Sequence, residues 1–248
     1  MSSVEPRLVA GSAAGRPPLA LSASPTRVEV RPGSWTSVRV TNPGRSALVV
    51  DVAPAGFDLD PRGRPRIENG HRGAGRWLVL APRRLALAAG RTAAVTVTAA
   101  VPRGAAPGEH DALVLLRTRV HARAPVPIVM QVGVVVVVRV RGRVVRRLDV
   151  RGVRVVRHGK RRLIVLTIRN RGNVSEVLPR RRVRIVLRRG RRILATLLPP
   201  RRRVLPHGVA VLVLPYRGGA RGAVRAIVSV RSPRAGVAVQ RRSFRLRL

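Results

Sequence analysis

Residues 38–50 read VRVTNPGRSALVV, and residues 166–178 read LTIRNRGNVSEVL. Each stretch is an alternating strand that stops at an Asn-x-Gly turn and restarts as a second apolar run. Two more pairs match in the same order: RRLALAAGRTAAVTV (83–97) with RRRVLPHGVAVLV (201–213), and RGAAPGEHDALVLLR (103–117) with RGGARGAVRAIVSVR (217–231). Three ordered matches predict two copies of one domain. The offset shrinks from 128 to 114 residues, so the first copy carries an insertion, which we place at residues 54–76.

The composition favours β structure in both copies. Hydrophobic residues make up 45 % of the 248 residues but aromatic residues only 2 %, so Val, Leu, Ile and Ala must fill the cores. Valine is β-branched and suits strands. Short apolar runs separated by Gly, Pro and Asn, without a helical period, predict an all-β fold of two tandem immunoglobulin-like β-sandwich domains. We expect a disordered tail at 1–18, Ig-like domain 1 at 19–142 and a strongly basic Ig-like domain 2 at 143–248, with one continuous stretch, residues 128–156, ending the first domain and beginning the second. His158-Gly159 and Arg189-Gly190 are expected at the tips of two hairpins in domain 2.

The charge is large and unevenly divided. Lys and Arg total 51 against 10 Asp and Glu, and residues 141–248 carry a net charge of +30 against +11 for residues 1–140. This excess predicts a polyanion-binding surface. Codon bias in a GC-rich genome explains the preference for arginine equally well, and the sequence leaves both explanations open.

Ten arginines of domain 2 are the predicted polyanion-binding residues, because guanidinium groups bind phosphate and carboxylate through paired hydrogen bonds. Domain 2 offers only Tyr216 and Phe244 for stacking, so nonspecific binding fits better than base recognition. The ten cluster at expected strand ends and hairpin tips: Arg180, Arg181, Arg182, Arg188, Arg189, Arg191, Arg192, Arg201, Arg202 and Arg203.

The valine-rich strand at 132–140 is apolar on both faces. Val132, Val134 and Val136 point to one side, and Val135 and Val137 point to the other. Such a strand is either covered or lies at an edge where it pairs with another strand. The sequence leaves two interpretations of Val135 and Val137: packing against domain 2, which we favour, or pairing with a partner strand.

The segments SPTRVEVRPGSWTSVRVTNPG (24–44) and WLVLAPRRLALAAGRTAAVTVTAAVPRGAAPGEHDALVLLR (77–117) resemble bacterial Ig-like domains of the pilus-chaperone type. With the second Ig-like domain, residues 19–248 most resemble cell-surface proteins built on the WxL-interacting, peptidoglycan-binding module. The resemblance implies a non-catalytic protein outside the cytoplasm, in the cell envelope or periplasm. The motifs are structural and specify the fold better than the activity.

Two departures from these families limit what the resemblance implies. Pilus chaperones hold a subunit's terminal carboxylate with an Arg in the first strand and a Lys in the last strand of domain 1. Arg27 matches the Arg, but residues 133–136 contain no Lys. The surface proteins usually carry a leader and a C-terminal membrane helix, and we find no pattern for either here.

Catalytic and metal-binding patterns are weak, so we predict no enzyme activity, no metal and no cofactor. The five histidines are scattered, cysteine is absent, and Asp58-x-Asp60 continues with an arginine where a calcium loop needs a ligand. Glu109, His110 and Asp111 are interpreted as a polar strand start, since no nucleophile motif accompanies them.

The predicted function is non-catalytic binding or scaffolding in the cell envelope. The predicted partner is an anionic wall polymer or an envelope protein, with no membrane span. One alternative is a pilus or secretion chaperone that pairs a client strand beside Arg27, Val135 and Val137. A nonspecific nucleic-acid-binding protein is the other.

Overall fold

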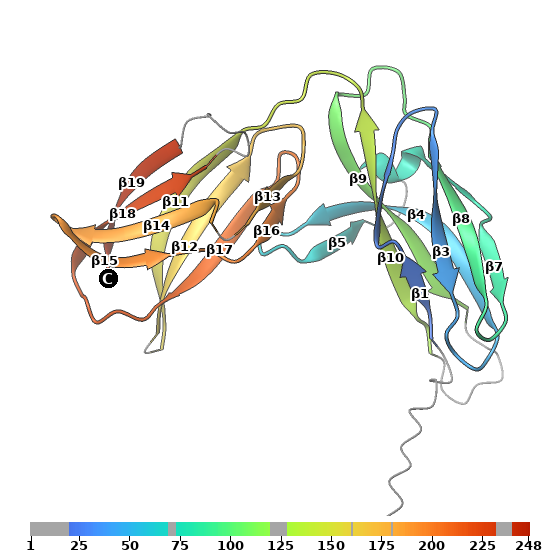
Figure 1. Cartoon of the computed structure of the whole chain (residues 1–248), viewed down its shortest axis with the longest axis horizontal. Helices are drawn as coiled ribbons and strands as arrows, with labels where there is room; N and C mark the ends of the chain where they lie inside the picture. Colours follow the sequence, from blue (N-terminus) through green and yellow to red (C-terminus); the bar gives the residue numbers. More distant parts are fainter. Residues whose placement is uncertain (1–19, 69–72, 120–127, 160, 180, 232–239) are drawn as a thin grey trace, which may run out of the picture.

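The computed structural model describes residues 20–68, 73–119, 128–159, 161–179, 181–231 and 240–248. These residues form strands and one short 3-10 helix, arranged as two β-sandwiches that follow each other along the chain (Figure 1). The predicted all-β fold with two tandem Ig-like domains is confirmed. The predicted tail lies outside the described residues. No helix in these ranges is long and apolar enough to cross a membrane.

The first sandwich consists of two sheets. One has the order β1-β3-β8-β6, with β1 Ser22–Ser24, β3 Trp35–Thr41, β8 Thr92–Ala99 and β6 Leu78–Ala81. The other has the order β2-β10-β9-β4-β5, with β2 Arg27–Val30, β10 Gln131–Val140, β9 Gly108–Thr118, β4 Leu48–Leu59 and β5 Pro65–Glu68. Strand β7 (Arg84–Leu87) also pairs with β4, and the 3-10 helix η1 spans Gly73–Trp77.

The second sandwich repeats this arrangement with fewer strands. One sheet has the order β11-β12-β17, with β11 Leu148–His158, β12 Arg161–Asn170 and β17 Val209–Tyr216. The other has the order β15-β14-β18-β19, with β15 Arg192–Leu197, β14 Val183–Arg189, β18 Ala223–Val230 and β19 Gln240–Arg247. Strands β13 (Glu176–Leu178) and β16 (Arg202–Val204) form a separate pair.

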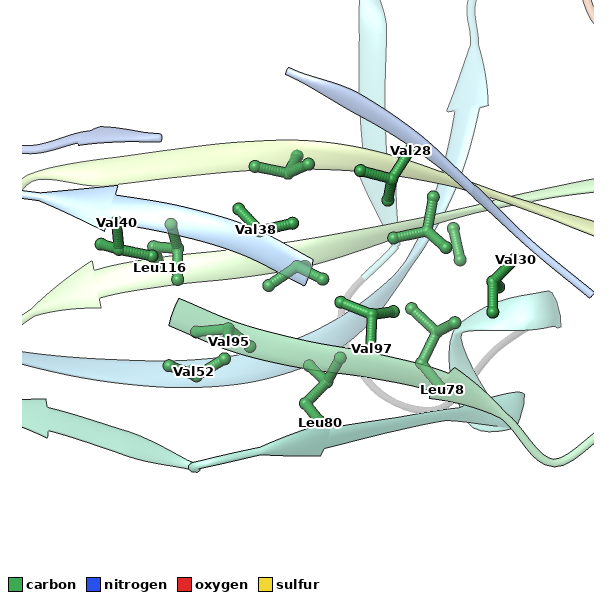
Figure 2. Packing of buried hydrophobic residues seen from close by; sticks show 14 of the residues in the cluster. Val28, Val30, Val38, Val40, Val52, Leu78, Leu80, Val95, Val97 and Leu116 are labelled. Atoms are coloured by element: carbon green, nitrogen blue, oxygen red, sulfur yellow. The ribbon is translucent and has the colours of Figure 1, made fainter. Parts of the chain in front are cut away.

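Aliphatic side chains fill both cores, as the composition predicts. In β3, Val38 and Val40 are fully buried whereas Ser37 and Arg39 are exposed. Figure 2 shows the valines and leucines of the first sandwich meeting between its two sheets. Each buried Val or Leu side chain contributes about 1.5–3 kcal/mol relative to an exposed one. Trp77 is the only aromatic residue of this cluster.

The repeat is clearest at two buried asparagines. The side-chain amide of Asn42 donates to the carbonyl oxygens of Ser46, Leu87 and Ala88, and its Oδ1 accepts from the N–H of Gly44. Asn170 makes the same set of bonds, donating to Val174, Val204 and Leu205 and accepting from Gly172. Both asparagines are 0 % exposed. The predicted equivalence of Asn42 and Asn170 is confirmed.

Strand order agrees between the copies wherever both have a strand. The order β1-β3-β8 matches β11-β12-β17, and β10-β9-β4-β5 matches β19-β18-β14-β15. Strands β2 and β6 have no counterpart among the described residues of the second copy. The insertion predicted at 54–76 forms the β4–β5 hairpin and η1, apart from residues 69–72, which are not described.

One sequence-based expectation is wrong. We expected residues 128–156 to run continuously from one sandwich into the next, but β10 ends at Val140 and β11 begins at Leu148. Gly142 has φ 137°, a backbone conformation that only glycine adopts easily, and an added Cβ would lie 2.6 Å from the side chain of Pro107. The predicted boundary between residues 142 and 143 falls within this connection.

Candidate partner-strand site and domain interface

Strand β10 is paired along its whole length on one side and along four of its ten residues on the other. It pairs antiparallel with β9 from Gln131 to Val140 and parallel with β2 only from Val135 to Val138. Strand β1 lies in the other sheet, so the chain changes sheets between Ser24 and Arg27. Among the described residues, nothing pairs with the β2 side of residues 131–134, which we call the open edge of β10.

The backbone of the open edge points into this unpaired side at alternate residues. The N–H of Val135 donates to the carbonyl oxygen of Thr26 at 3.0 Å, so the backbone N–H and C=O groups of odd-numbered residues in β10 point away from β9. Met130 faces β9, since its carbonyl oxygen accepts from the N–H of Thr118 at 3.0 Å. The N–H and C=O groups of Gln131 and Gly133 therefore point outward from the sheet edge.

Exposed apolar side chains precede the open edge. Ile128 is 54 % exposed and Val129 is 40 % exposed, although both are large and hydrophobic. Gln131 and Gly133 are exposed as well. A strand edge with unpaired backbone groups and exposed aliphatic side chains is suited to pairing with another strand.

The three residues of the predicted partner-strand site lie together, but their edge has an internal partner. Val135 lies opposite Arg27, and Val137 lies opposite Glu29 of β2. Val137 is fully buried and Val135 is half-buried. The partner-strand role of Val135, Val137 and Arg27 stays a prediction, and the accessible backbone groups lie two to four residues earlier, at Gln131 and Gly133.

Several buried residues belong to neither core and lie where the two sandwiches meet. They are Ala55, Leu113 and Val137 of the first sandwich and Val174 and Leu205 of the second. Leu113 lies opposite both Ala55 and Val135 in the sheet, so these three share its outer face. This arrangement is what packing of β10 against the second sandwich requires.

The start of β9 bonds directly to the second sandwich. The N–H of Glu109 donates to the carbonyl oxygen of Asn173 at 2.8 Å, and the N–H of Ser175 donates to Oε2 of Glu109 at 2.9 Å. The side-chain amide of Asn173 donates to the carbonyl oxygens of Pro107 and Arg143, each at 2.8 Å. Asn173 thus joins the first sandwich, the connecting segment and the turn after β12.

Glu109 is a carboxylate held by both sandwiches. Arg139 donates to Oε1 of Glu109 at 3.0 Å, and the Glu109 side chain is only 8 % exposed. Burial works to raise the pKa of Glu109, but the Ser175 N–H and the charge of Arg139 outweigh it, so the pKa lies below the usual value. The ionised form of Glu109 therefore stabilises the domain interface.

Asp111 lies on the same face of β9 as Glu109 but has the opposite tendency. Arg27 donates to its Oδ1 at 3.1 Å, and the Asp111 side chain is 3 % exposed. Burial raises the pKa of Asp111, despite the opposing charges of Arg27 and Arg203, and the nearby Glu109 adds to the rise. Its Oδ2 has no hydrogen-bond partner among the described residues.

The β4–β5 hairpin makes the second set of contacts between the sandwiches. The N–H of Val211 donates to the carbonyl oxygen of Pro61 at 2.6 Å, and Arg202 donates to the carbonyl oxygen of Arg62. In Figure 1, β5 and β16 lie between the two sandwiches. A hollow of about 250 Å³ beside these contacts is lined by residues of both halves, among them Phe57, His110, Asp111, Asn173 and Leu205.

The ten predicted polyanion-binding arginines fall into separate places. Arg182 donates to the buried Glu176 at 2.6 Å, and Arg202 and Arg203 lie at the domain interface. Arg188, Arg189, Arg191 and Arg192 belong to the β14–β15 hairpin. Arg181 and Arg201 are exposed, and Arg180 lies outside the described residues. They do not form one surface, and their polyanion-binding role stays a prediction.

Sequence reasoning missed the residues that join the sandwiches. Glu109 and Asp111 were interpreted as a polar strand start, yet two carboxylates at alternate positions in so basic a chain were a signal of specific pairing. Asn173 carried no signal, because its partners lie far away in sequence. The ranges that the structure describes hold no group of His, Asp and Glu residues that could bind a metal ion.

Comparison with known proteins supports the fold. No protein-family model and no curated protein matches the chain. Among solved structures, a chaperone–tip adhesin complex of CFA/I fimbriae biogenesis matches with a TM-score of 0.53 and 13 % identity, covering 90 % of this chain and 98 % of that one. The class 5 fimbriae chaperone CfaA matches with a TM-score of 0.52 at 13 % identity and the same coverage. The predicted fold relationship to pilus chaperones is confirmed, and the resemblance to WxL-interacting proteins stays a prediction.

Proposed function

We propose that this chain is a non-catalytic, chaperone-like protein that acts outside the cytoplasm and pairs the open edge of β10 with an extended strand of a protein partner. The observation that carries the proposal is the incomplete pairing of β10 on its β2 side, where outward backbone groups at Gln131 and Gly133 follow the exposed Ile128 and Val129. The fold likeness to fimbrial chaperones, one of them in complex with a tip adhesin, adds support.

The chemistry of the open edge favours an extended, apolar partner. Main-chain hydrogen bonds to Gln131 and Gly133 would supply affinity without sequence preference, and alternate partner side chains would contact the aliphatic residues. The first sandwich is only modestly basic, so charge contributes less here than in the second sandwich. The partner strand would lie beside residues 129–133 and end where β2 begins.

The test uses a synthetic peptide of about seven residues, a typical strand length, that alternates valine with threonine and ends in lysine. The lysine prevents attraction to the basic second sandwich. We expect the peptide to slow hydrogen exchange at the amides of Gln131 and Gly133, because these amides become bonded. Absence of added protection at peptide saturation would contradict the proposal.

Two variants with a matched control sharpen this test. Gly133→Pro removes an outward N–H while leaving the β9 pairs of its neighbours, and Ile128→Asp places a charge beside the edge. Both should weaken peptide binding by about tenfold or more, the loss of roughly 1.4 kcal/mol. Ile193→Asp, at a position 60 % exposed in the second sandwich, should bind the peptide like the unaltered chain.

A second candidate function, scaffolding on an anionic envelope polymer such as wall teichoic acid or peptidoglycan-linked polymer, is favoured by the net charge of +30 over residues 141–248. The two functions do not compete for one surface, because the open edge of β10 lies in the first sandwich. Nonspecific nucleic-acid binding would use the same charge, and it stays a prediction.

A further inference from the structure

The two acidic residues of the second sandwich lie at the end nearest the first sandwich. Asp149 is the second residue of β11 and lies opposite Arg169, and Glu176 follows Ser175, which bonds to Glu109. Both carboxylates are already paired. Asp149 lies 3.4–3.6 Å from Arg151, Arg171 and Arg242, and Glu176 lies 2.6–3.1 Å from Arg146 and Arg182.

The opposite end of this sandwich, which we call the distal end, gathers arginines instead. Strand register places the β11–β12 turn, the β14–β15 turn and the 217–222 loop there, since Arg162 lies opposite Tyr216 and Arg188 opposite Arg225. Residues 141–248 contain no acidic residue besides Asp149 and Glu176. The described arginines of the distal end therefore have no carboxylate side chain of their own sandwich to pair with: Arg157, Arg161, Arg162, Arg188, Arg189, Arg191, Arg192, Arg217 and Arg221.

Three of these arginines converge on one hollow. Arg157, Arg162 and Arg221 line it together with Gly159, and its volume is about 350 Å³. The three come from the end of β11, the start of β12 and the loop before β18. Three like charges around a hollow repel one another, and an anion between them would remove that repulsion.

The guanidinium of Arg162 is already fixed in place. Its Nη2 donates to the carbonyl oxygen of Gly218 at 2.9 Å, its Nη1 donates to that of Ala220, and its Cζ lies 5.2 Å from the centre of the Tyr216 ring. A guanidinium has five N–H groups, so others remain for a ligand. A cation held in position before binding loses little conformational entropy when a ligand arrives.

Neighbouring arginines extend the positive surface beyond the hollow. Arg189 donates to the carbonyl oxygens of Arg221 and Ala223, which ties the β14–β15 turn to the loop that carries Arg221. Arg191 and Arg192 are exposed on the same turn. Figure 1 shows this hairpin pointing away from the first sandwich.

We propose that Arg157, Arg162 and Arg221 form a binding site for the phosphate groups of a polymer that repeats phosphodiesters without bases, such as a glycerol-phosphate chain. The phosphorus of a phosphodiester is tetrahedral, so its two non-bridging oxygens can accept hydrogen bonds from guanidinium groups on different sides, whereas one guanidinium satisfies both oxygens of a planar carboxylate. The flanking arginines contact further phosphates along the chain. Base stacking is not supported, because Tyr216 is 6 % exposed and Arg162 lies over its ring.

The distal site and the open edge of β10 lie in different sandwiches. The distal site lies at the end of the second sandwich remote from the β9 contacts, whereas the open edge of β10 lies in the first. A chain held on a polymer at its distal end would leave the open edge accessible. The inference does not depend on the proposed strand pairing, since neither the residues nor the ligand are shared.

The test measures binding of the full chain to a glycerol-phosphate oligomer by fluorescence anisotropy over a series of salt concentrations. The triple variant Arg157→Gln, Arg162→Gln, Arg221→Gln should bind at least about tenfold more weakly, since three charge-assisted contacts are lost together. The binding constant decreases with salt, and the plot of its logarithm against log salt should become less steep by about 2. This follows from about 0.7 for each of the three lost contacts with a single-stranded polymer.

The matched control is the triple variant Arg141→Gln, Arg143→Gln, Arg147→Gln, which removes the same charge from exposed arginines of the segment that connects the two sandwiches. It should keep most of the affinity and the slope. Equal losses in the two triples would overturn the proposal in favour of net charge alone. Polyglutamate binding as tightly as the oligomer, or an oligothymidylate binding more than tenfold tighter, would also overturn it. If the distal triple fails to fold, Arg157→Gln with Arg221→Gln leaves the bonds of Arg162 intact and carries the same test.

Discussion

The last strands of the two copies, β10 and β19, hold the same position in the fold and have opposite chemistry. Each pairs antiparallel with the strand that precedes it in the chain: β10 pairs with β9, and β19 pairs with β18. Strand β10 reads QVGVVVVVRV and is apolar on both faces, whereas β19 reads QRRSFRLR. In β19 the arginines are exposed, and Phe244 and Leu246 are half-buried against the core.

The difference shows two ways to treat an edge strand. Charged side chains along an exposed edge oppose pairing with another chain, and β19 has this protection. The open edge of β10, residues 131–134, has no charged side chain, and β2 covers only Val135–Val138. In the second copy, charged side chains thus protect the edge strand from pairing, whereas in the first copy part of the edge strand can still accept another strand.

The largest effect is expected where a buried charge in one copy replaces a buried leucine in the other. In the repeat, Glu176 takes the place of Leu48, and both are nearly fully buried. Glu176→Leu leaves the partly buried Arg182 without its partner, which should cost about 3–5 kcal/mol in urea unfolding. Adding Arg182→Leu should recover most of that loss. A double variant as unstable as the single one would show that the pair contributes more than charge neutralisation.

The next effect tests whether the buried asparagines are equivalent. Asn42→Ala and Asn170→Ala should each lower the unfolding free energy by about 3 kcal/mol, because buried backbone groups lose their partners. Urea unfolding followed by circular dichroism measures both. Losses that differ by more than about 1 kcal/mol, the net value of one hydrogen bond, would break the equivalence, because the two asparagines make the same set of bonds at the same burial.

A smaller effect concerns the carboxylates at the domain interface. The pKa of Glu109 is lowered in the folded protein, so its contribution is present above its usual value of 4.5 and is lost as the pH falls through the lowered value. Glu109→Gln should therefore cost about 1.5–3 kcal/mol at neutral pH, the range for a hydrogen bond to a charged group, and less at pH 3, which lies below the usual pKa of the carboxyl. A loss that is the same at both pH values would contradict this role.

Asp111 should respond in the opposite sense. Its raised pKa means that its contribution is present below the usual value and is lost as the pH rises through the raised value. Asp111→Asn keeps an acceptor for Arg27 and should change stability at neutral pH less than Glu109→Gln does. Thermal unfolding of the two variants side by side measures this contrast, and a larger loss for Asp111→Asn would refute it.

The smallest effect on stability is expected when the two edges exchange their chemistry. Arg245→Val with Arg247→Val removes the charges of β19, and Gln131→Lys with Gly133→Lys adds charges to the open edge of β10. Both pairs should shift stability by about 0.5 kcal/mol or less, as exposed substitutions do. Light scattering should show increased self-association for the β19 variant and none for the β10 variant. Equal association of both would mean that charge does not protect these edges.

Much of the fold follows from local sequence patterns. The Asn-x-Gly turns mark equivalent places, and the predicted turns at His158-Gly159 and Arg189-Gly190 contain glycines with φ 56° and 54°. Strands β13 and β16 were not predicted, because three residues carry too little periodicity and their pairing depends on the packed sandwich. The same holds for the break between β10 and β11.

The candidate sites follow from the sequence only in part. The valine run identifies β10 as unusual, but the strand that covers four of its ten residues begins at Arg27, more than a hundred residues earlier. The arginine runs mark the charge, yet folding sends Arg202 and Arg203 to the domain interface and brings Arg157, Arg162 and Arg221 together. Contacts between distant residues decide both sites, and no local pattern encodes them.

The scarcity of aromatic residues gives the molecule a built-in spectroscopic label. Both of its tryptophans, Trp35 and Trp77, lie in the first sandwich, and the only tyrosine, Tyr216, lies in the second. Trp77 is 8 % exposed and packs edge-on against His110, with ring centres 4.8 Å apart, whereas Trp35 is 68 % exposed. Tryptophan emission therefore reports on the first sandwich alone. Its red shift during denaturation, compared with loss of the β signal in circular dichroism, separates the unfolding of one half from that of the other without any added probe.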